Sequence, residues 1–253
     1  MTARVLTLFG TRPEVIKLAP VIRRLEAFPS AFQTINVASS QHTSLLHPFV
    51  ESFGIRIDHD LRVMRADQSP HEVCARVLTA LQPLIAELRP DLILVQGDTT
   101  TTLAGALAGF YSRVPVGHVE AGLRTDNSMS PFPEEMNRRL VTRVATYHFA
   151  ATEHNRRTLL GEGVPDETIF VTGNPVVDAL QAIVARPRER GAVDDVVDAT
   201  EGSRRIVLTT HRRESLGQTM RENLAVLRSF VESRPDVTLI FPVHPNPSVR
   251  ESA

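Results

Sequence analysis

Charged side chains follow the first short apolar run of this 253-residue sequence, at positions where they could bind an anion. Gly10 and Arg12 come directly after the run, and Lys17 lies one turn into the helical pattern that Pro13 opens. A helix N-terminus, a guanidinium and an ammonium group together suit a diphosphate. A tight turn with solvated charges explains the same spacing, so these residues alone leave both interpretations open.

Carboxylates occupy comparable places further along the chain. Asp98 comes soon after an apolar run and ahead of four threonines, where capping of the next helix would explain it. Glu120 follows its run directly and has no comparable capping role, so it is the stronger candidate for proton transfer. Glu134 and Glu135 fall in the first turn of a predicted helix, where the helix dipole favours negative charge. His118 lies inside an apolar run and is expected to be a hydrogen-bonded core residue.

A second basic turn follows a later β-like run. His211, Arg212 and Arg213 lie between that run and the next helical pattern, which favours an anion site over a solvated turn. His244 follows another run and could line the same cleft, although a plain loop explains it equally well. We expect this basic turn to face the first one across a cleft.

Eight short apolar or β-branched runs alternate with helical patterns, and this alternation predicts an α/β fold with a parallel sheet. Ligands of such sheets lie beyond the carboxyl ends of the strands, where the turns above would fall. The clearest helical patterns are 14–28, 70–88 and 218–231. The runs are 5–9, 34–38, 92–96, 114–119, 147–151, 169–172, 206–210 and 237–241.

Composition narrows the function classes. The hydrophobic fraction of 42% argues against a fibre or a disordered chain, and the net charge of -1 provides no overall field for nucleic acid or an anionic membrane. The single cysteine, Cys74, forbids an intramolecular disulfide and suits the cytoplasm. No apolar leader or membrane-length run is present in the sequence, so a cytosolic protein is expected. No histidine or carboxylate spacing indicates a metal site, and no G-x-G-x-x-G motif indicates bound NAD.

Two domains are expected, at residues 1–173 and 174–253. The segment 186–205 is charged and poor in large apolar residues, which indicates a linker or surface loop. The remainder has two strand patterns and one helix, too few to close a doubly wound domain, so the chain is expected to stop within its second domain.

Taken together, the turns resemble those of the non-hydrolysing UDP-N-acetylglucosamine 2-epimerases, in order and spacing. The matching stretches are GTRPEVIKLAPV, LVQGDTTTTLAGALA, PVGHVEAGLRT, SPFPEEMNRR, TGNPVVDAL and LTTHRRESLG. The resemblance implies two Rossmann-like domains in a GT-B-type arrangement, a UDP-sugar in the cleft between them, a homodimer, and no metal or nicotinamide cofactor. It implies catalytic roles for Asp98, Glu120, Glu134 and His211, substrate binding by Arg12, Lys17, Arg212, Asn174 and His244, and regulatory contacts at Gln41, His42 and Gln68.

Two stretches depart from the family's pattern. Ser39-Ser40-Gln41-His42 stands where the family often has Thr-Gly-Gln-His, and Gly173-Asn174-Pro175 stands where it has Gly-Asn-Thr. Both lie near positions that resemble the family's nucleotide-binding or regulatory contacts.

The implied reaction interconverts UDP-GlcNAc and UDP-ManNAc by elimination and re-addition of UDP, supplying ManNAc for cell-surface polysaccharide. Cationic side chains would hold the departing diphosphate and carboxyl groups would move the C2 proton. Two alternatives stay open: a GT-B glycosyltransferase that uses a UDP-sugar, and a nucleotide-sugar-binding remnant without catalysis.

Overall fold

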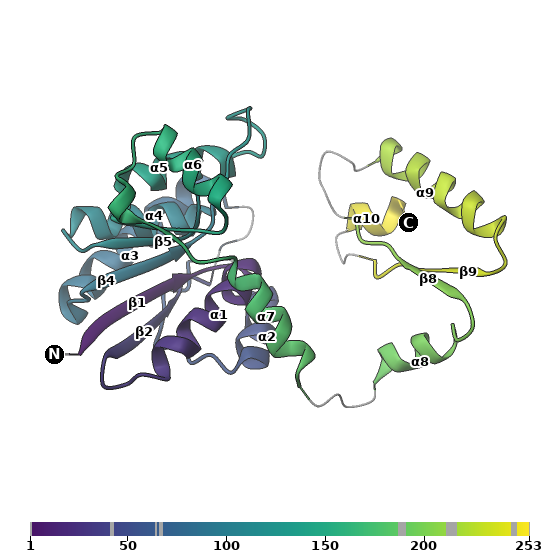
Figure 1. Ribbon diagram of the computed structural model, residues 1–253, viewed down its shortest axis with the longest axis horizontal. Helices are drawn as coiled ribbons and strands as arrows, with labels where there is room; N and C mark the ends of the chain where they lie inside the picture. Colours follow the sequence, from purple (N-terminus) through teal and green to yellow (C-terminus); the bar gives the residue numbers. More distant parts are fainter. Residues whose placement is uncertain are drawn as a thin grey trace. The chain divides into compact units, whose positions relative to one another are not determined.

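The computed structural model describes residues 2–40, 43–63, 65, 68–186, 191–210, 217–243 and 247–252. The chain divides into two compact units, Met1–Arg186 and Pro187–Ala253 (Figure 1). The sequence-based boundary after Gly173 differs from this division. Helix α7 (Pro175–Val184) packs against helix α1 (Arg12–Glu26), and therefore belongs to the first unit.

The first unit is built on a seven-stranded sheet in the order β3-β2-β1-β4-β5-β6-β7, with every neighbouring pair parallel. This is the Rossmann order, in which the chain reverses direction across the sheet between β1 and β4. The expected α/β class with a parallel sheet is thus confirmed. The strands are β1 Ala3–Phe9, β2 Phe32–Ala38, β3 His59–Asp60, β4 Leu92–Gln96, β5 Val116–Ala121, β6 Tyr147–Ala150 and β7 Ile169–Val171.

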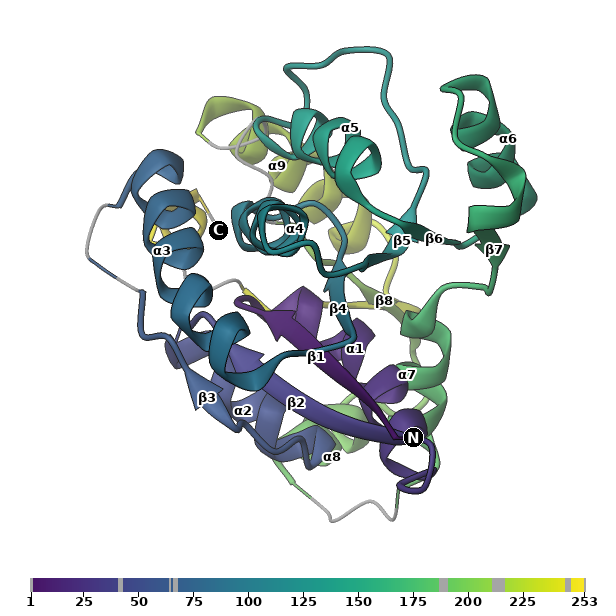
Figure 2. The same cartoon turned by 90° about the vertical axis from the view of Figure 1, so that its left-hand side faces the viewer.

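Helices cover both faces of this sheet (Figure 2). One core joins the sheet to α3, α4 and α5 through residues such as Leu8, Val77 and Ala104, and another joins it to α1, α2 and α7 through Phe9, Leu18 and others. Burial on both faces explains why the central strands read as continuous apolar runs. Besides α1 and α7, the helices are α2 Thr43–Phe53, α3 Pro70–Leu88, α4 Thr100–Tyr111, α5 Glu134–Val144 and α6 Glu153–Gly161, with a short 3-10 turn at Asp166–Thr168.

Capping residues set where the helices begin. Thr11 is the N-cap of α1 and Pro13 lies in its first turn, so this helix starts two residues before the predicted 14–28. Helix α3 has the predicted bounds, because Ser69 caps it and Pro70 opens it. Two-residue strand β3 was missed, since two residues carry no periodic signal.

Small residues let α4 lie close to the sheet. A Cβ atom on Gly105 would come within 2.4 Å of Leu8 Cδ2 and 3.0 Å of Val95 Cγ1, and one on Gly109 within 2.4 Å of Val116 Cγ2. The glycines of the sequence TLAGALAG therefore fix the distance between α4 and the strands on either side of the chain reversal.

The second unit contains two parallel strands, paired through contacts such as Ile206↔Leu239. The predicted linker 186–205 was wrong in part, because it includes helix α8, whose start is held by the Gly191 N–H donating to the Asp194 carboxylate at 2.8 Å. Strand β8 also begins and ends earlier than predicted. The described elements are α8 Ala192–Asp198, β8 Arg204–Val207, α9 Gln218–Glu232, β9 Val237–Ile240 and α10 Pro247–Ser252. Across the described ranges, no helix has the length and apolar character needed to cross a membrane.

Candidate functional site

Glu120 is the centre of a hydrogen-bonded cluster at the carboxyl edge of the first sheet. Its side chain is 8% exposed, and three N–H donors from different elements converge on its carboxylate. Lys17 Nζ donates to Oε2 at 2.5 Å, Gln96 Nε2 donates to Oε2 at 2.5 Å, and Asn174 Nδ2 donates to Oε1 at 2.7 Å. The donors come from α1, the end of β4 and the turn before α7, so the topology gathers them from across the first unit.

The backbone of Glu120 is unusual for a residue with a side chain. Its φ is +66°, and the pairing of β5 with β6 shifts register between Val119 and Ala121. Bulges of this kind re-aim a side chain, and left-handed backbone in a non-glycine residue persists only where its surroundings hold it. The neighbouring Gly97 has a φ of +74°, a left-handed conformation that favours glycine, and a Cβ atom there would lie at an ordinary contact distance of 3.7 Å from Glu120 Oε2.

Asp98 lies in the turn after β4, beside this cluster. Arg138 Nη1 donates to its carboxylate at 2.8 Å, and Asn137 Nδ2 donates to its backbone oxygen at 2.8 Å. Burial raises the pKa of Asp98 above its ordinary value; the positive charge of Arg138 opposes this rise, and the negative charges of Glu134 and Glu120 add to it. The helix-capping role considered for Asp98 belongs instead to Thr99, whose side chain accepts from the Thr102 N–H.

The adjacent glutamates of α5 have different environments. Glu135 is fully buried and bonds Arg138, Arg139 and the Thr125 N–H. Burial raises its pKa, but the bonds from Arg139 and Arg138 outweigh that effect, so the net pKa is lowered. Glu134 is half-buried and close enough to Asp98 for its charge to raise the pKa of that residue. Glu135 therefore has a structural role, and Glu134 is the glutamate whose charge acts on Asp98.

His118 is a core residue, as the sequence indicated. It is fully buried, and its Nε2 lies 2.7 Å from the Gly97 carbonyl oxygen. Burial lowers its pKa to about 4, so the ring is neutral near pH 7 and Nε2 carries the proton donated to Gly97. This bond fixes the turn that holds Asp98.

Arg12 is the first residue of α1, and its guanidinium lies 5.6 Å from the centre of the Phe49 ring. Arg124, which also follows a strand, is bound by Glu162 through Nε at 2.7 Å and Nη2 at 2.9 Å, and is committed to that ion pair. Gln68 lies just before α3, where its Oε1 accepts from the Arg65 N–H at 2.9 Å. The other predicted site residues, Gln41, His42, His211, Arg212 and His244, lie outside the described residues.

The sequence did not single out three residues that organise this site. Gln96 looks like the last residue of an apolar strand, but a buried amide at that position needs a hydrogen-bond partner, and this requirement was the available signal. Arg138 looks like an ordinary helix-surface residue. Glu14 looks like a helix-capping glutamate, although it is only 1% exposed.

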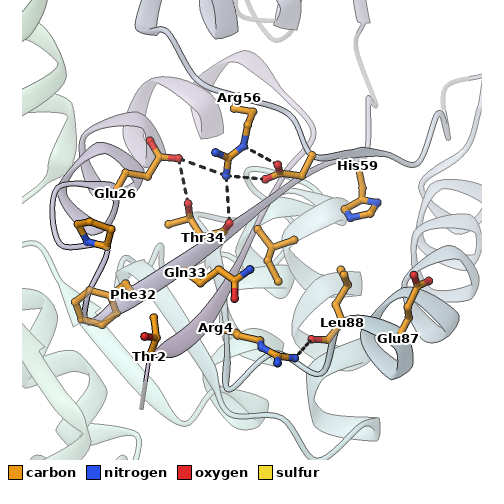
Figure 3. A pocket seen from close by; sticks show the side chains of 13 residues that line it. Thr2, Arg4, Glu26, Phe32, Gln33, Thr34, Arg56, His59, Glu87 and Leu88 are labelled. Atoms are coloured by element: carbon orange, nitrogen blue, oxygen red, sulfur yellow. Dashed lines mark hydrogen bonds and ion pairs between the residues drawn. The ribbon is translucent and has the colours of Figure 1, made fainter.

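A cavity of the first unit lies elsewhere. It measures about 1020 Å³ and is lined by the amino-terminal parts of β1 and β2, the ends of α1 and α3, and the loop before β3. Figure 3 shows Arg56 bonded to Thr34 and paired with Glu26, while Arg4 donates to the Leu88 carbonyl oxygen. Arg56 also donates to the Asp58 carboxylate. Both arginines of this cavity are thus bonded to other groups of the protein. The cavity also lies away from the carboxyl edge of the sheet, where Glu120 is found.

Comparison with known proteins points to one family. The sequence profile described as UDP-N-acetylglucosamine 2-epimerase matches residues 23–253. A relative from Thermotoga maritima is 48% identical over 252 residues, covering 98% of this chain and 65% of the relative. The chain thus spans about two thirds of that relative's length.

Solved structures with the same fold come from proteins of the same description. A structure from Listeria monocytogenes has a TM-score of 0.94 and 43% identity, covering 100% of this chain and 66% of its own. A Neisseria meningitidis UDP-GlcNAc 2-epimerase, solved bound to UDP-GlcNAc, has a TM-score of 0.87 and 37% identity, covering 98% of this chain and 68% of its own.

Proposed function

The chain belongs to the UDP-N-acetylglucosamine 2-epimerase family, and from this premise we propose that it interconverts UDP-GlcNAc and UDP-ManNAc by eliminating UDP and adding it back. The observation that carries the proposal is the cluster around Glu120. A strained, buried carboxylate held by three N–H donors lies beside Asp98, whose pKa is raised by burial. The Neisseria relative bound to UDP-GlcNAc supports the substrate class.

The chemistry of the sugar explains why elimination is needed. C2 of an N-acetylhexosamine is not adjacent to a carbonyl carbon, so removal of its proton alone would leave an unstabilised carbanion. If the C1–O bond to UDP breaks as the C2 proton leaves, the electron pair of the C–H bond forms the C1–C2 double bond of 2-acetamidoglucal. UDP departs with the electron pair of the C1–O bond. Re-addition of UDP, with protonation of C2 on the opposite face, gives the epimer.

This route needs carboxyl groups that exchange protons with C2. Glu120 accepts N–H bonds on both of its oxygens, which hold its carboxylate at a fixed position for proton exchange with C2. Asp98 has a raised pKa, which favours its protonated form more than in an ordinary aspartate and suits a group that returns the proton. Glu134, whose charge acts on Asp98, is the third carboxyl group of the set.

The departing diphosphate needs cations and N–H donors. Arg12 and Lys17 lie in the first two turns of α1, where the helix N-terminus also favours an anion. By resemblance to the family, His211 and Arg212 complete this set, and Asn174 and His244 contact the nucleotide. Charge on the diphosphate grows as the C1–O bond breaks, so these donors stabilise the transition state more than the bound substrate.

The wider setting follows from the product. UDP-ManNAc is an activated sugar, so we place the reaction before glycosyl transfer into cell-surface polysaccharide. The single cysteine and the nucleotide-sugar substrate support a cytoplasmic location. We also propose a homodimer formed through the exposed apolar side chains of α4 and α5.

Heavy water tests the reaction. The natural full-length protein is incubated with UDP-GlcNAc alone in D2O, and the incorporation of deuterium at C2 of the sugar is followed by NMR. UDP-ManNAc with deuterium at C2 is expected, followed by labelling of the remaining UDP-GlcNAc. The released 2-acetamidoglucal and UDP should be detectable without added nicotinamide, which separates elimination from transient oxidation at C3.

Two outcomes would contradict the proposal. Full epimerisation with no deuterium entering C2 would mean that the proton never meets exchangeable carboxyl groups. A requirement for a sugar acceptor before any turnover would indicate a glycosyltransferase instead.

A further inference from the structure

Glu14 is a buried carboxyl group that joins two turns of the first sheet. Its Oε2 accepts three hydrogen bonds from the turn after β1, from the Gly10 N–H at 3.0 Å, the Thr11 N–H at 2.7 Å and the Thr11 hydroxyl at 2.7 Å. With 1% of the residue exposed, these bonds are shielded from water. One oxygen therefore holds the turn from which α1 begins.

The other oxygen reaches the turn after β4, 85 positions further along the chain. Thr99 Oγ1 donates to Glu14 Oε1 at 2.8 Å, and Thr102 Oγ1 lies 3.1 Å from it. The Thr102 hydroxyl has one proton and also lies 2.6 Å from the Gln96 carbonyl oxygen, so it can direct that proton to either acceptor. One side chain thus spans the gap between β1 and β4, where the strand order reverses.

Residues of the proposed site lie on both sides of this bridge. Lys17, one turn after Glu14 in α1, donates to Glu120. Asp98 directly precedes Thr99. A change in the distance between the two turns would therefore move the Lys17 ammonium relative to the carboxyl groups of Asp98 and Glu120.

We propose that Glu14 is a positioning residue, which holds the turn after β1 against the turn after β4 so that Lys17, Asp98 and Glu120 keep their reactive spacing. This inference rests on the proposed function. Glu14 does not move the proton itself, because all of its described bonds go to protein groups of the two turns.

Helix α3 provides a matched comparison within the same unit. Glu72 has the same place in its helix as Glu14, three residues after the N-cap. Its Oε2 accepts from the Ser69 N–H at 2.8 Å, but the residue is exposed and its bonds stay within its own first two turns. Loss of Glu72 therefore removes a helix cap without changing the spacing of two turns.

Three substitutions separate the effect of side-chain length at position 14 from the effect of its charge. Glu14→Gln keeps the length of the side chain, and its amide oxygen can accept the bonds of Gly10 and Thr11. Its NH2 group can donate to the Thr99 and Thr102 hydroxyls if Thr99 turns to donate to Thr102, 3.1 Å away, and Thr102 donates to the Gln96 carbonyl oxygen. Glu14→Asp keeps the carboxylate but is one methylene too short to span the gap. Glu14→Ala removes both properties. Glu72→Gln and Glu72→Ala serve as controls.

We would measure kcat, KM and amide hydrogen exchange on the natural full-length protein. We expect Glu14→Gln to keep kcat within about threefold, and Glu14→Asp and Glu14→Ala to lower it about 100-fold, the scale of an ångström-sized misplacement. Exchange at the Gly10 and Thr11 amides should quicken in the Asp and Ala variants and stay slow in the Gln variant. The Glu72 variants should lower the melting temperature slightly and leave kcat unchanged.

The inference would be overturned if Glu14→Asp kept its kcat and Glu14→Gln lost it, because the charge of the side chain would then matter and its length would not. Unchanged kcat in both would also overturn it and reduce Glu14 to a helix cap. This pair decides the question even if Glu14→Ala does not fold. An inactive wild-type protein would instead refute the proposed function, and the exchange rates would still report whether Glu14 joins the two turns.

Discussion

The left-handed backbone of Glu120 has an energetic cost that a glycine at this position would avoid. With φ at +66°, the residue retains a strained conformation of the kind that clusters at functional sites, at a cost on the order of 1–3 kcal/mol. The bonds from Lys17, Gln96 and Asn174 offset that cost and direct the carboxylate toward Gly97 and Asp98. This combination of strain and convergent donors distinguishes Glu120 from the carboxylates that serve only the fold.

Replacement of Glu120 tests its role in proton transfer. Glu120→Gln should leave folding and UDP binding intact and lower kcat by roughly two to four orders of magnitude, the scale of general acid–base catalysis. Steady-state kinetics and calorimetric titration with UDP measure the two quantities. Glu162→Gln, which weakens the ion pair with Arg124 away from the cluster, is the control and should keep normal turnover. Near-normal turnover in Glu120→Gln would rule out the role.

The depressed pKa of His118 predicts a pH dependence of stability. Burial lowers this pKa from 6.5 to about 4, so between these values the unfolded chain binds a proton that the folded protein does not. The contribution of His118 to the free energy of unfolding should therefore be complete above about pH 6.5 and should be lost as the pH falls toward 4. At about 1.4 kcal/mol per pKa unit, the loss amounts to a few kcal/mol at most.

Denaturant unfolding of the wild type and His118→Asn at pH 7 and pH 4.5 measures this contribution. Asparagine does not titrate, so the variant should lose less stability than the wild type over this range. Parallel losses in the two proteins would show that other groups carry the pH dependence.

The residues that sequence reasoning found and missed differ in a physical way. Glu120 was found because a carboxylate directly after an apolar run lacks a local explanation, although the structure places it at a bulge within β5. Glu14 and Gln96 were missed because their partners are far away in the chain, at Thr99 and Glu120 respectively, while each has an ordinary local explanation as a helix cap or a strand residue. Pairing across the sheet is needed to expose such roles.

At the scale of elements, helix α4 determines how the turn after β4 is presented. Thr99 caps this helix, and Gly105 and Gly109 allow it to pack directly on β1, β4 and β5. A helix rich in alanine and glycine has little side-chain bulk of its own, so its position depends on close contact with the strands.

A pair of glycine substitutions tests this packing. Gly105→Ala should destabilise the protein by about 1–3 kcal/mol, because its Cβ would meet Leu8 Cδ2 at 2.4 Å and force the helix outward. Gly161→Ala, at the end of α6, should be neutral or stabilising by up to about 1 kcal/mol, because its added Cβ would meet no atom within 4 Å. Thermal or denaturant unfolding measures both. A neutral Gly105→Ala would show that α4 can shift freely.

Periodicity predicted most elements of the first unit and fewer details of the second. Alternating apolar runs and capping residues located strands such as β4 and helix α3 closely, since the strands are buried on both faces and the helix has a capping box. Helix α8 was missed because its short sequence is acidic and sits in a charged segment. The division after Arg186 also depends on packing of α7 on α1, which sequence pattern alone does not contain.

At the scale of the whole molecule, apolar side chains on α4 and α5 support the proposed homodimer. Phe110 and Tyr111 on α4 are 56% and 68% exposed, and Leu140 on the neighbouring α5 is 45% exposed. Exposed apolar patches of this kind mark protein–protein contacts.

Sedimentation velocity tests the assembly. Leu140→Glu should convert the dimer into a monomer, because it places a charge within the apolar contact. Phe28→Glu is the control: Phe28 is also 45% exposed but lies after α1, so the dimer should persist. A monomeric wild type, or a dimer unaffected by Leu140→Glu, would place the contact elsewhere or exclude it.

The order of the strands also bears on how the protein reaches its native state. Lys17 and Glu120 are 103 positions apart, and β1 pairs with β4 through residues as distant as Thr7 and Leu94. Such non-local pairing makes folding slow, because a long loop must close before any contact compensates for its lost entropy. The candidate site cannot exist until the central strands have joined, so binding competence should emerge among the last events of folding rather than with the first helices.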